Sequence, residues 1–293
     1  MKNNWRLTLL LFFLSCPVFA QNADITGKFD WEKMEIQAIV SLNLASAGIK
    51  LPGGRTTGES IINSEYRRLM RPHILGIQAD SSSTLGDLVR NGELSLADID
   101  NFVLNARFTP HFLSPDLLTL QASCIIDLEN ISASLIRHSR PAEIRRTLSP
   151  VPAPDYTGII IIASSPLPVH GMKSSASVVP CLFPKIWDTN MNLLYERNML
   201  EKGRKTIARY APESDIFINN PSGLSPEIAR LVGSNPLRII ARRLFGDTPT
   251  DLIIESEDAL RIISTEQNRR LLSEGRVVIV IDDSAIRMEF QDH

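Results

Sequence analysis

Histidines, cysteines, serines and acidic pairs are the residues of this 293-residue chain that could support catalysis or metal binding. None of the five histidines has another histidine four positions later, and no H-E-x-x-H spacing occurs. The sequence also contains no C-x-x-C, G-x-S-x-G or S-x-x-K motif. We therefore expect no metal site, no cofactor and no nucleophile with a positioned base, and we predict that the protein is not an enzyme.

Two polar pairs follow apolar segments. Ser164-Ser165 stands where a strand-end nucleophile could lie, but Pro166 and Pro168 exclude the helix that would build an oxyanion hole beside it. Asp282-Asp283 could be read as paired acids, although catalytic carboxylates normally come from separate elements. Both pairs are interpreted as solvated exits from strands.

The densest basic group consists of Arg238, Arg242 and Arg243, with Arg230 nearby in sequence. Such a group could bind an acidic partner or a glycan, and it is the predicted partner-binding surface. A charged face or edge of a sheet, which hinders pairing between sheet edges, explains the same pattern. Both interpretations stay open from sequence.

The first twenty residues have the three-part pattern of a secretory signal. A basic start is followed by an apolar core over 7–15, which is too short to span a bilayer, and by a small residue at Ala20. The segment 13–16 also resembles a lipobox, so lipidation of Cys16 is the alternative to cleavage after Ala20. We expect a periplasmic protein. The alternative is an outer-membrane lipoprotein, which would contact the membrane through Cys16.

Charge and cysteine usage limit the partners further. Loss of Lys2 and Arg6 with the signal leaves 29 basic and 33 acidic residues, a net charge of −4, and no basic block, so we expect no nucleic-acid binding. Export would permit a disulfide between Cys124 and Cys181. A cysteine on the apolar side of a strand also behaves as a small hydrophobe, so the disulfide stays an open question.

The elements that position these residues follow from hydrophobic periodicity. Alternation over 34–45 and 118–128 predicts two half-buried strands. Helical spacing predicts a helix over 57–70 that Pro72 limits, and the capping box of Ser95 and Asp98 predicts another helix to about Asn105. A further helix is expected over 129–138. Strands separated by helices predict an α+β unit.

The second half begins after four prolines between positions 141 and 154, which predict a linker. Ser225-Pro226 predicts the start of a short helix that ends at Gly233. The other predictions are one helix over 257–272 and strands over 156–163, 182–186, 193–195, 237–245, 251–255 and 277–281.

The predicted fold class is α+β, with two small mixed α/β domains joined by a proline-rich linker. The predicted divisions are a signal peptide (1–20), an N-terminal α+β domain (21–147), the linker (148–155) and a C-terminal α+β domain (156–293).

Several segments are similar to those of a known family. The sequence has an aromatic-Thr-Gly-apolar strand from Tyr156, the pattern P-x-L-x-P-x-I-x-D over 180–188, and Leu194-Tyr195. In the first half, the segment 77–82 (IQADSS) fits the same pattern. The chain thus resembles exported bacterial proteins related to flagellar basal-disk (FlgP-like) accessory lipoproteins, including spirochaete periplasmic relatives. Many relatives have Asp-Ala-Arg-Gly where this chain has Ile-Ala-Ser-Ser at 162–165.

The resemblance implies non-catalytic work without a cofactor, such as scaffolding in the cell envelope or support of a flagellar assembly. The implied partners are envelope proteins, which include flagellar basal-body components or further copies of the chain. Two alternatives belong to other classes: a hydrolase of envelope polymers would need a cleft with converging acids, histidine or serine, and a periplasmic ligand-binding module would need a deep cleft between the domains.

Overall fold

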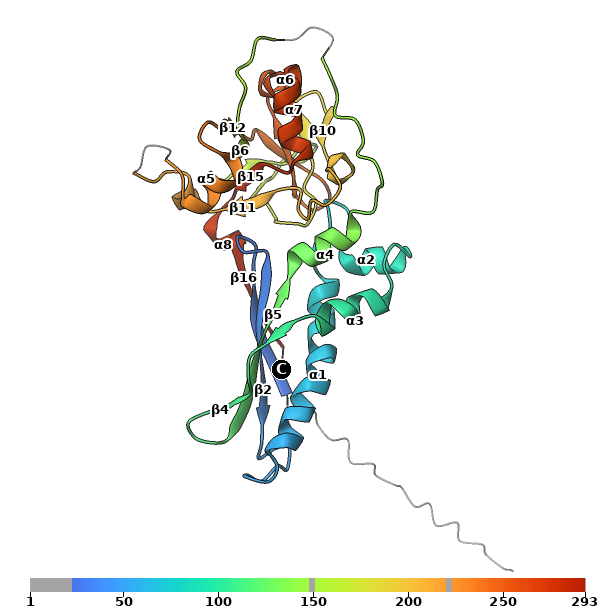
Figure 1. Cartoon of the computed structure of the whole chain (residues 1–293), viewed down its shortest axis with the longest axis vertical. Coiled ribbons are helices and arrows are strands. Elements are labelled where there is room, and N and C mark those ends of the chain that lie inside the picture. The colour runs from blue at the N-terminus through green and yellow to red at the C-terminus, as the bar shows by residue number, and fades with distance from the viewer. Residues whose placement is uncertain (1–22, 148–150, 220–222, 293) are drawn as a thin grey trace, which may run out of the picture.

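A computed structural model describes residues 23–147, 151–219 and 223–292 (Figure 1). The predicted signal peptide with Cys16 and the first three residues of the predicted linker lie outside these ranges. Within them the chain forms two mixed α/β domains, which confirms the predicted fold class.

The N-terminal domain is an antiparallel sheet with the strand order β16-β1-β2-β5-β3, and β4 also pairs with β5. One face is covered by the long helix α1 (Figure 1). The predicted alternation is confirmed, because every second residue of β2 and β5 is buried. The strands of this domain are β1 (Ala23–Asp30), β2 (Glu35–Asn43), β3 (Arg107–Phe108), β4 (Phe112–Leu113), β5 (Thr119–Asp127) and β16 (Arg287–Asp292).

The helices of this domain are α1 (Arg55–Leu75), α2 (Leu85–Arg90), α3 (Leu96–Leu104) and α4 (Leu128–Leu135). The capping box at Ser95 and Asp98 is confirmed, and an equivalent box at Thr84 and Asp87 opens α2. The prediction that Pro72 limits the first helix was wrong. That helix continues to Leu75, and the buried side chain of Ile74 holds its last turn against the core.

The second domain contains a parallel sheet with the order β11-β15-β6-β12. Its strand β6 is buried on both faces, as a continuous apolar run predicts. Ile160 packs with α5 on one face, and Ile159 and Ile161 belong to the main core. The elements are β6 (Ile159–Ile162), β11 (Arg209–Ala211), β12 (Leu237–Ile240), β15 (Val277–Val280) and the helix α5 (Pro226–Val232).

A second sheet of this domain has the order β10-β9-β14-β13. It consists of β9 (Ile186–Asp188), β10 (Leu193–Tyr195), β13 (Arg243–Phe245) and β14 (Asp251–Ile254). The other elements are the pair β7 (Leu167–Pro168) and β8 (Ser175–Ala176), the 3-10 turns η1 (Arg197–Met199) and η2 (Glu213–Asp215), and the helices α6 (Ser256–Ser264), α7 (Glu266–Ser273) and α8 (Asp283–Ile286).

Three predictions in this domain were wrong in detail. The strand predicted over 237–245 is two strands, β12 and β13, which belong to different sheets. The helix predicted over 257–272 breaks at Thr265, whose backbone is extended and whose hydroxyl caps α7. The strand predicted over 182–186 begins only at Ile186, because the amides of Leu182 and Phe183 donate to carbonyls of the other domain.

The last strand returns to the first domain. Residues of β16 pair antiparallel with β1, from Asp30↔Arg287 to Ile25↔Asp292. The last strand of the predicted C-terminal domain (156–293), β16, therefore belongs to the sheet of the N-terminal domain. Phe290 lies opposite Gly27 and stacks on His73 of α1 with ring centroids 4.0 Å apart, so burial of an aromatic ring holds this strand in place.

The β1–β2 turn also connects the domains. Its Trp31 is buried and meets Tyr210 of β11 edge to face, with ring centroids 5.8 Å apart. The Trp31 amide donates to the carbonyl of Ile286, at 3.0 Å. An aromatic contact of this kind removes a large apolar area from water, and it ties the tip of the N-terminal sheet to the second domain.

Candidate functional site

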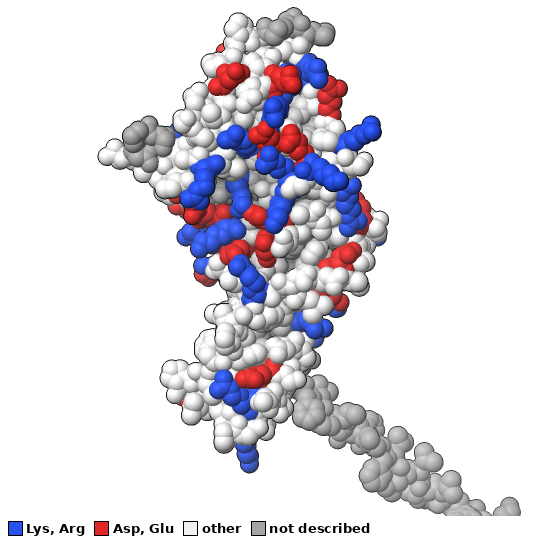
Figure 2. Space-filling view, viewed as in Figure 1, with Lys and Arg blue, Asp and Glu red and all other residues white. Residues whose placement is uncertain are grey.

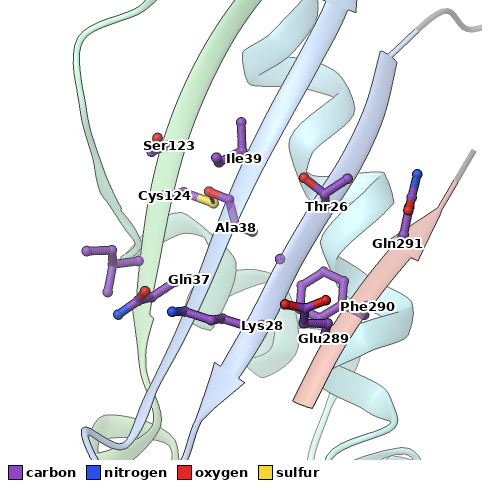
Figure 3. Close-up of a pocket in the computed structure, with 12 residues that line it drawn as sticks. Thr26, Lys28, Gln37, Ala38, Ile39, Ser123, Cys124, Glu289, Phe290 and Gln291 are labelled. Carbon is purple, nitrogen blue, oxygen red and sulfur yellow. Dashed lines mark hydrogen bonds between the residues drawn. The ribbon is translucent and has the colours of Figure 1, made fainter. Parts of the chain in front are cut away.

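A groove with a volume of about 590 Å³ lies on the N-terminal sheet and is lined by residues of β1, β2, β5 and β16 (Figure 3). Figure 3 shows α1 behind the strands, so the groove is on the face that this helix leaves uncovered. Outward-pointing side chains supply its chemistry: Thr26, Lys28, Gln37, Ile39, Ser123 and Glu289.

These side chains combine charge, hydrogen bonding and an apolar centre. Lys28 of β1 lies opposite Glu289 of β16 in the sheet register, so the lining of the groove contains one charge of each sign. Ile39, whose exposed fraction is 40%, stands among the polar side chains. Such a surface can bind another molecule through hydrogen bonds and apolar contact.

Cys124 is one of the residues that line this groove. Its thiol is buried and donates to the carbonyl of Ala38 at 3.5 Å. Burial raises the pKa of Cys124 to about 11, so the thiolate that would react is scarce near neutral pH. Its burial and raised pKa argue against Cys124 as a nucleophile in this groove.

The three arginines of the predicted partner-binding group do not form one cluster. Arg238 lies on β12, the edge strand of the parallel sheet, and donates to the carbonyl of Ile216 at 3.0 Å. Arg242 forms an ion pair with Glu255 at 3.0 Å. Arg243 is exposed on β13, an edge strand of the other sheet.

Arg242 and Arg243 come together at a second hollow of about 340 Å³, which His170, Thr189 and Glu255 also line. This pair could contact an acidic group on a partner. All three arginines stand on or beside edge strands, where charge also hinders unwanted pairing. A partner-binding role for them stays a prediction.

A buried carboxylate that the sequence analysis missed joins the domains. Asp251 of β14 is fully buried, and its carboxylate accepts four hydrogen bonds. The donors are the Ser81 hydroxyl and Trp187 Nε1, both at 3.1 Å, the Thr250 hydroxyl at 3.0 Å and the Lys185 amide at 3.3 Å. Burial raises the pKa of Asp251 above its ordinary value. In the sequence, the only indication of this buried carboxylate is an acidic residue at the start of an apolar strand.

The backbone around this carboxylate brings two distant segments together. The amides of Leu182 and Phe183 donate to the carbonyls of Gln78 and Ala79, at 3.0 and 2.9 Å. These residues belong to the two segments, 77–82 and 180–188, that supported the family resemblance. Their shared hydrogen bonds give both segments a structural role in the junction.

Ser164-Ser165 and Asp282-Asp283, the two polar pairs of the sequence analysis, lie where the chain leaves β6 and β15. The Ser164 hydroxyl donates to Glu213 Oε1 at 3.1 Å, and Asp282 accepts from the Ser284 amide at 2.9 Å to cap α8. The hydrogen bonds from Ser284 lower the pKa of Asp282. An ionised cap of this kind stabilises the helix start, so Asp282 has a structural explanation.

Over residues 23–147, 151–219 and 223–292, no group of three or more His, Cys, Asp and Glu residues is placed to hold a metal ion. Nor does any helix in this part of the chain have the length and apolar character needed to span a membrane. Cys124 and Cys181 are both buried and unbonded, so the structure contains no disulfide between them.

The molecule is thus a two-domain α+β protein with a buried junction and an open groove on one sheet. Residues 22–134 match the family model of the Treponema pallidum Tp0624 N-terminal domain, and residues 158–283 match the model of the Tp0624 second domain. The chain therefore carries the N-terminal and second domains of this spirochaete family, in that order. No curated protein matches the chain significantly.

These matches support the spirochaete part of the predicted resemblance. A relation to flagellar basal-disk lipoproteins stays a prediction. The strand β16 lies outside both matched ranges, although it completes the sheet of the first domain.

Proposed function

We propose that this chain is a non-catalytic, exported envelope protein with a scaffolding or assembly role, and more specifically a flagellum-associated periplasmic accessory protein. The observation that carries the proposal is the junction between the domains. At this junction Asp251 accepts a hydrogen bond from Ser81, and Tyr210 packs against Trp31, so two polar side chains of the second domain serve as structural connections to the first.

A rigid junction suits a scaffold. Trp31 against Tyr210, Ser81 on Asp251 and the pairing of β16 with β1 connect the domains through three separate parts of the chain. Two surfaces remain outward: the groove on the N-terminal sheet and the hollow at Arg242 and Arg243. Two surfaces held at a constant separation could fix the distance between two partners.

The test is co-purification from envelope extracts of cells with and without intact flagella. We expect the chain to bring down a basal-body component only when flagella are intact. Ile39→Lys should weaken this capture if the groove is the contact, and Arg243→Glu should weaken it if the arginine hollow is the contact.

Each variant has a matched control. Met172→Lys changes another exposed apolar residue, and Lys202→Glu reverses another exposed charge, and neither residue lines the two surfaces. Identical fractionation with and without flagella, with no basal-body component recovered, would overturn the flagellar role. Mass measurement of the mature N-terminus separately tests export and distinguishes cleavage after Ala20 from lipidation of Cys16.

A periplasmic ligand-binding module is the second candidate, and one observation favours it. The groove volume of about 590 Å³ falls within the range of small-molecule sites, roughly 300–1,000 Å³. The groove lies on one sheet rather than between the domains. Saturable binding of a small polar molecule that Ile39→Lys abolishes would favour this candidate over a scaffold.

A further inference from the structure

The turn between β4 and β5 presents two leucines to solvent. The exposed fractions of Leu117 and Leu118 are 58% and 53%, and Phe112 of β4 adds a third exposed apolar side chain, at 44%. In Figure 1 this turn lies at the lower end of the N-terminal domain, away from the second domain. Exposed apolar side chains that gather at one tip are typical of a contact site.

Polar residues of the turn hold these leucines outward. The Leu117 amide donates to the carbonyl of Ser114 at 2.9 Å, and the Leu118 amide donates to the carboxylate of Asp116 at 3.0 Å. Leu117 has φ of 62°, in the left-handed region that glycine and asparagine enter more easily. The turn thus keeps a large apolar residue exposed in a conformation that leucine seldom adopts.

The chain enters the fold at the same end. The sheet registers pair Ala23 with Leu42, and Asn43 with Thr119. The Leu44 amide then donates to the Leu118 carbonyl at 2.9 Å. The first described residue and the two leucines therefore stand at one end of the sheet. Seven Cα–Cα steps separate Cys16 from Ala23, so these two residues lie at most about 25 Å apart.

Charge is scarce at this end. Figure 2 shows lysine, arginine, aspartate and glutamate crowded over the second domain, whereas the far end of the N-terminal domain carries a smaller group of charged side chains, with a basic one at the very tip. The loop 44–54 contains one charged residue, Lys50, and the turn 114–118 contains one, Asp116. A tip with one charged residue in each of two loops loses less hydration on entering the headgroup region of a bilayer than a densely charged surface does.

We propose that this end of the protein is a membrane-surface contact, in which Leu117 and Leu118 enter the interfacial layer of a phospholipid bilayer. The proposal rests on the proposed envelope role and deepens it by stating which end faces the membrane. The low number of charged residues in the two loops suits lipid better than a protein partner, whose interface would carry a polar rim.

Two leucines bind a membrane only weakly, so we expect this contact to be reversible unless a second attachment is present. A single acyl chain binds a membrane reversibly, and stable attachment needs a second signal. If Cys16 is lipidated, the tip supplies that signal within reach of the anchor. If it is not, the tip gives reversible binding and orients the protein on the membrane.

The test is flotation of the full chain with vesicles of phosphatidylethanolamine and phosphatidylglycerol. The variant carries Leu117→Asn and Leu118→Asn, because asparagine accepts the positive φ at position 117. We expect the bound fraction to fall by about fivefold or more. Met172→Asn, which alters a residue of the second domain with an exposed fraction of 55%, should leave flotation unchanged.

A second readout does not depend on the double variant. An environment-sensitive dye on Leu118→Cys should shift to shorter wavelength when vesicles are added, and the same dye on Met172→Cys should not shift. Equal flotation of variant and parent, absence of flotation for both, or an unshifted dye at position 118 would overturn the proposal.

Two outcomes separate this proposal from the scaffold role. Loss of a captured envelope protein in the double variant, with flotation unchanged, would make the tip a protein contact and overturn membrane binding. Flotation that depends on the tip, with no basal-body component recovered, would sustain the membrane contact while the flagellar role fails.

Discussion

The hydroxyl of Ser81 donates a hydrogen bond of 3.1 Å to the carboxylate of Asp251, and this contact between the two domains links residues 170 positions apart in sequence. Ser81 belongs to a loop before α2, and Asp251 begins the apolar strand β14. Gly246 allows the approach, because a Cβ at that position would lie 2.3 Å from the Cβ of Ser81. The contact explains why so polar a group is buried at the core of the junction.

Asp251→Ala should destabilise the folded protein strongly. The substitution leaves Trp187 Nε1 and the Lys185 amide without their acceptor in a buried site, and we expect a loss of about 3 kcal/mol in the free energy of unfolding. Ser81→Ala removes one donor and should cost about 1 kcal/mol. Guanidinium unfolding followed by tryptophan fluorescence measures both. A change below about 0.5 kcal/mol for Asp251→Ala would contradict a structural role for this carboxylate.

The charge of Asp251 should also make stability depend on pH. Its folded pKa is raised by burial, so between the unfolded value of about 3.9 and the folded value the folded state binds more protons. The contribution of Asp251 is fully present below the unfolded pKa and is lost as the pH rises through the folded pKa. The stability of the parent relative to Asp251→Asn should therefore fall over that interval. A difference that is constant with pH would show that the pKa is not raised.

The thiols of Cys124 and Cys181 should resist modification in the native protein. Burial raises their pKa to about 11 and about 12, and both side chains are almost fully covered. Alkylation at pH 8, read peptide by peptide in a mass spectrometer, should label both cysteines only after denaturation. A peptide pair linked through Cys124 and Cys181 would contradict the unbonded state.

Gly27→Val should loosen the C-terminal strand. A Cβ at position 27 would stand 2.6 Å from the Phe290 ring and 2.5 Å from the carbonyl oxygen of Gln37, so β16 must move away. We expect a destabilisation of about 1–3 kcal/mol and faster amide hydrogen exchange in residues 287–292. Thr26→Val, at the neighbouring exposed position, is the control and should leave that exchange slow. Unchanged exchange in Gly27→Val would mean that Phe290 is not what holds the strand.

Local patterns could be read well from the sequence. Alternation placed β2 and β5, and Ser95 with Asp98 predicted the start of α3, because the atoms involved lie within a few residues of each other. The continuous apolar runs of β6 and β15 were correctly read as buried strands. The helix start at Ser225 and its end at Gly233 were confirmed for the same reason.

Longer helices and strands were predicted less well where the chain divides them into two elements. Nothing local in 237–245 shows that the chain leaves one sheet at Ile240 and joins another at Arg243. The helix predicted over 257–272 has no apolar residue between Ile263 and Leu271, and Thr265 turns extended in this gap and caps a new helix. The first break depends on pairing with strands distant in sequence, whereas the second coincides with the local cap that Thr265 forms with the Asn268 amide.

By itself, the sequence determined the fold class, the apolar strands, the capped helices and the absence of local catalytic motifs, because propensity, periodicity and caps act over a few residues. Only the tertiary structure decided that β16 completes the first sheet, that Ser81 meets Asp251, and that Arg238 stands apart from Arg242 and Arg243. These relations depend on contacts between residues far apart in the chain, and burial and hydrogen bonding select them only when the whole core assembles.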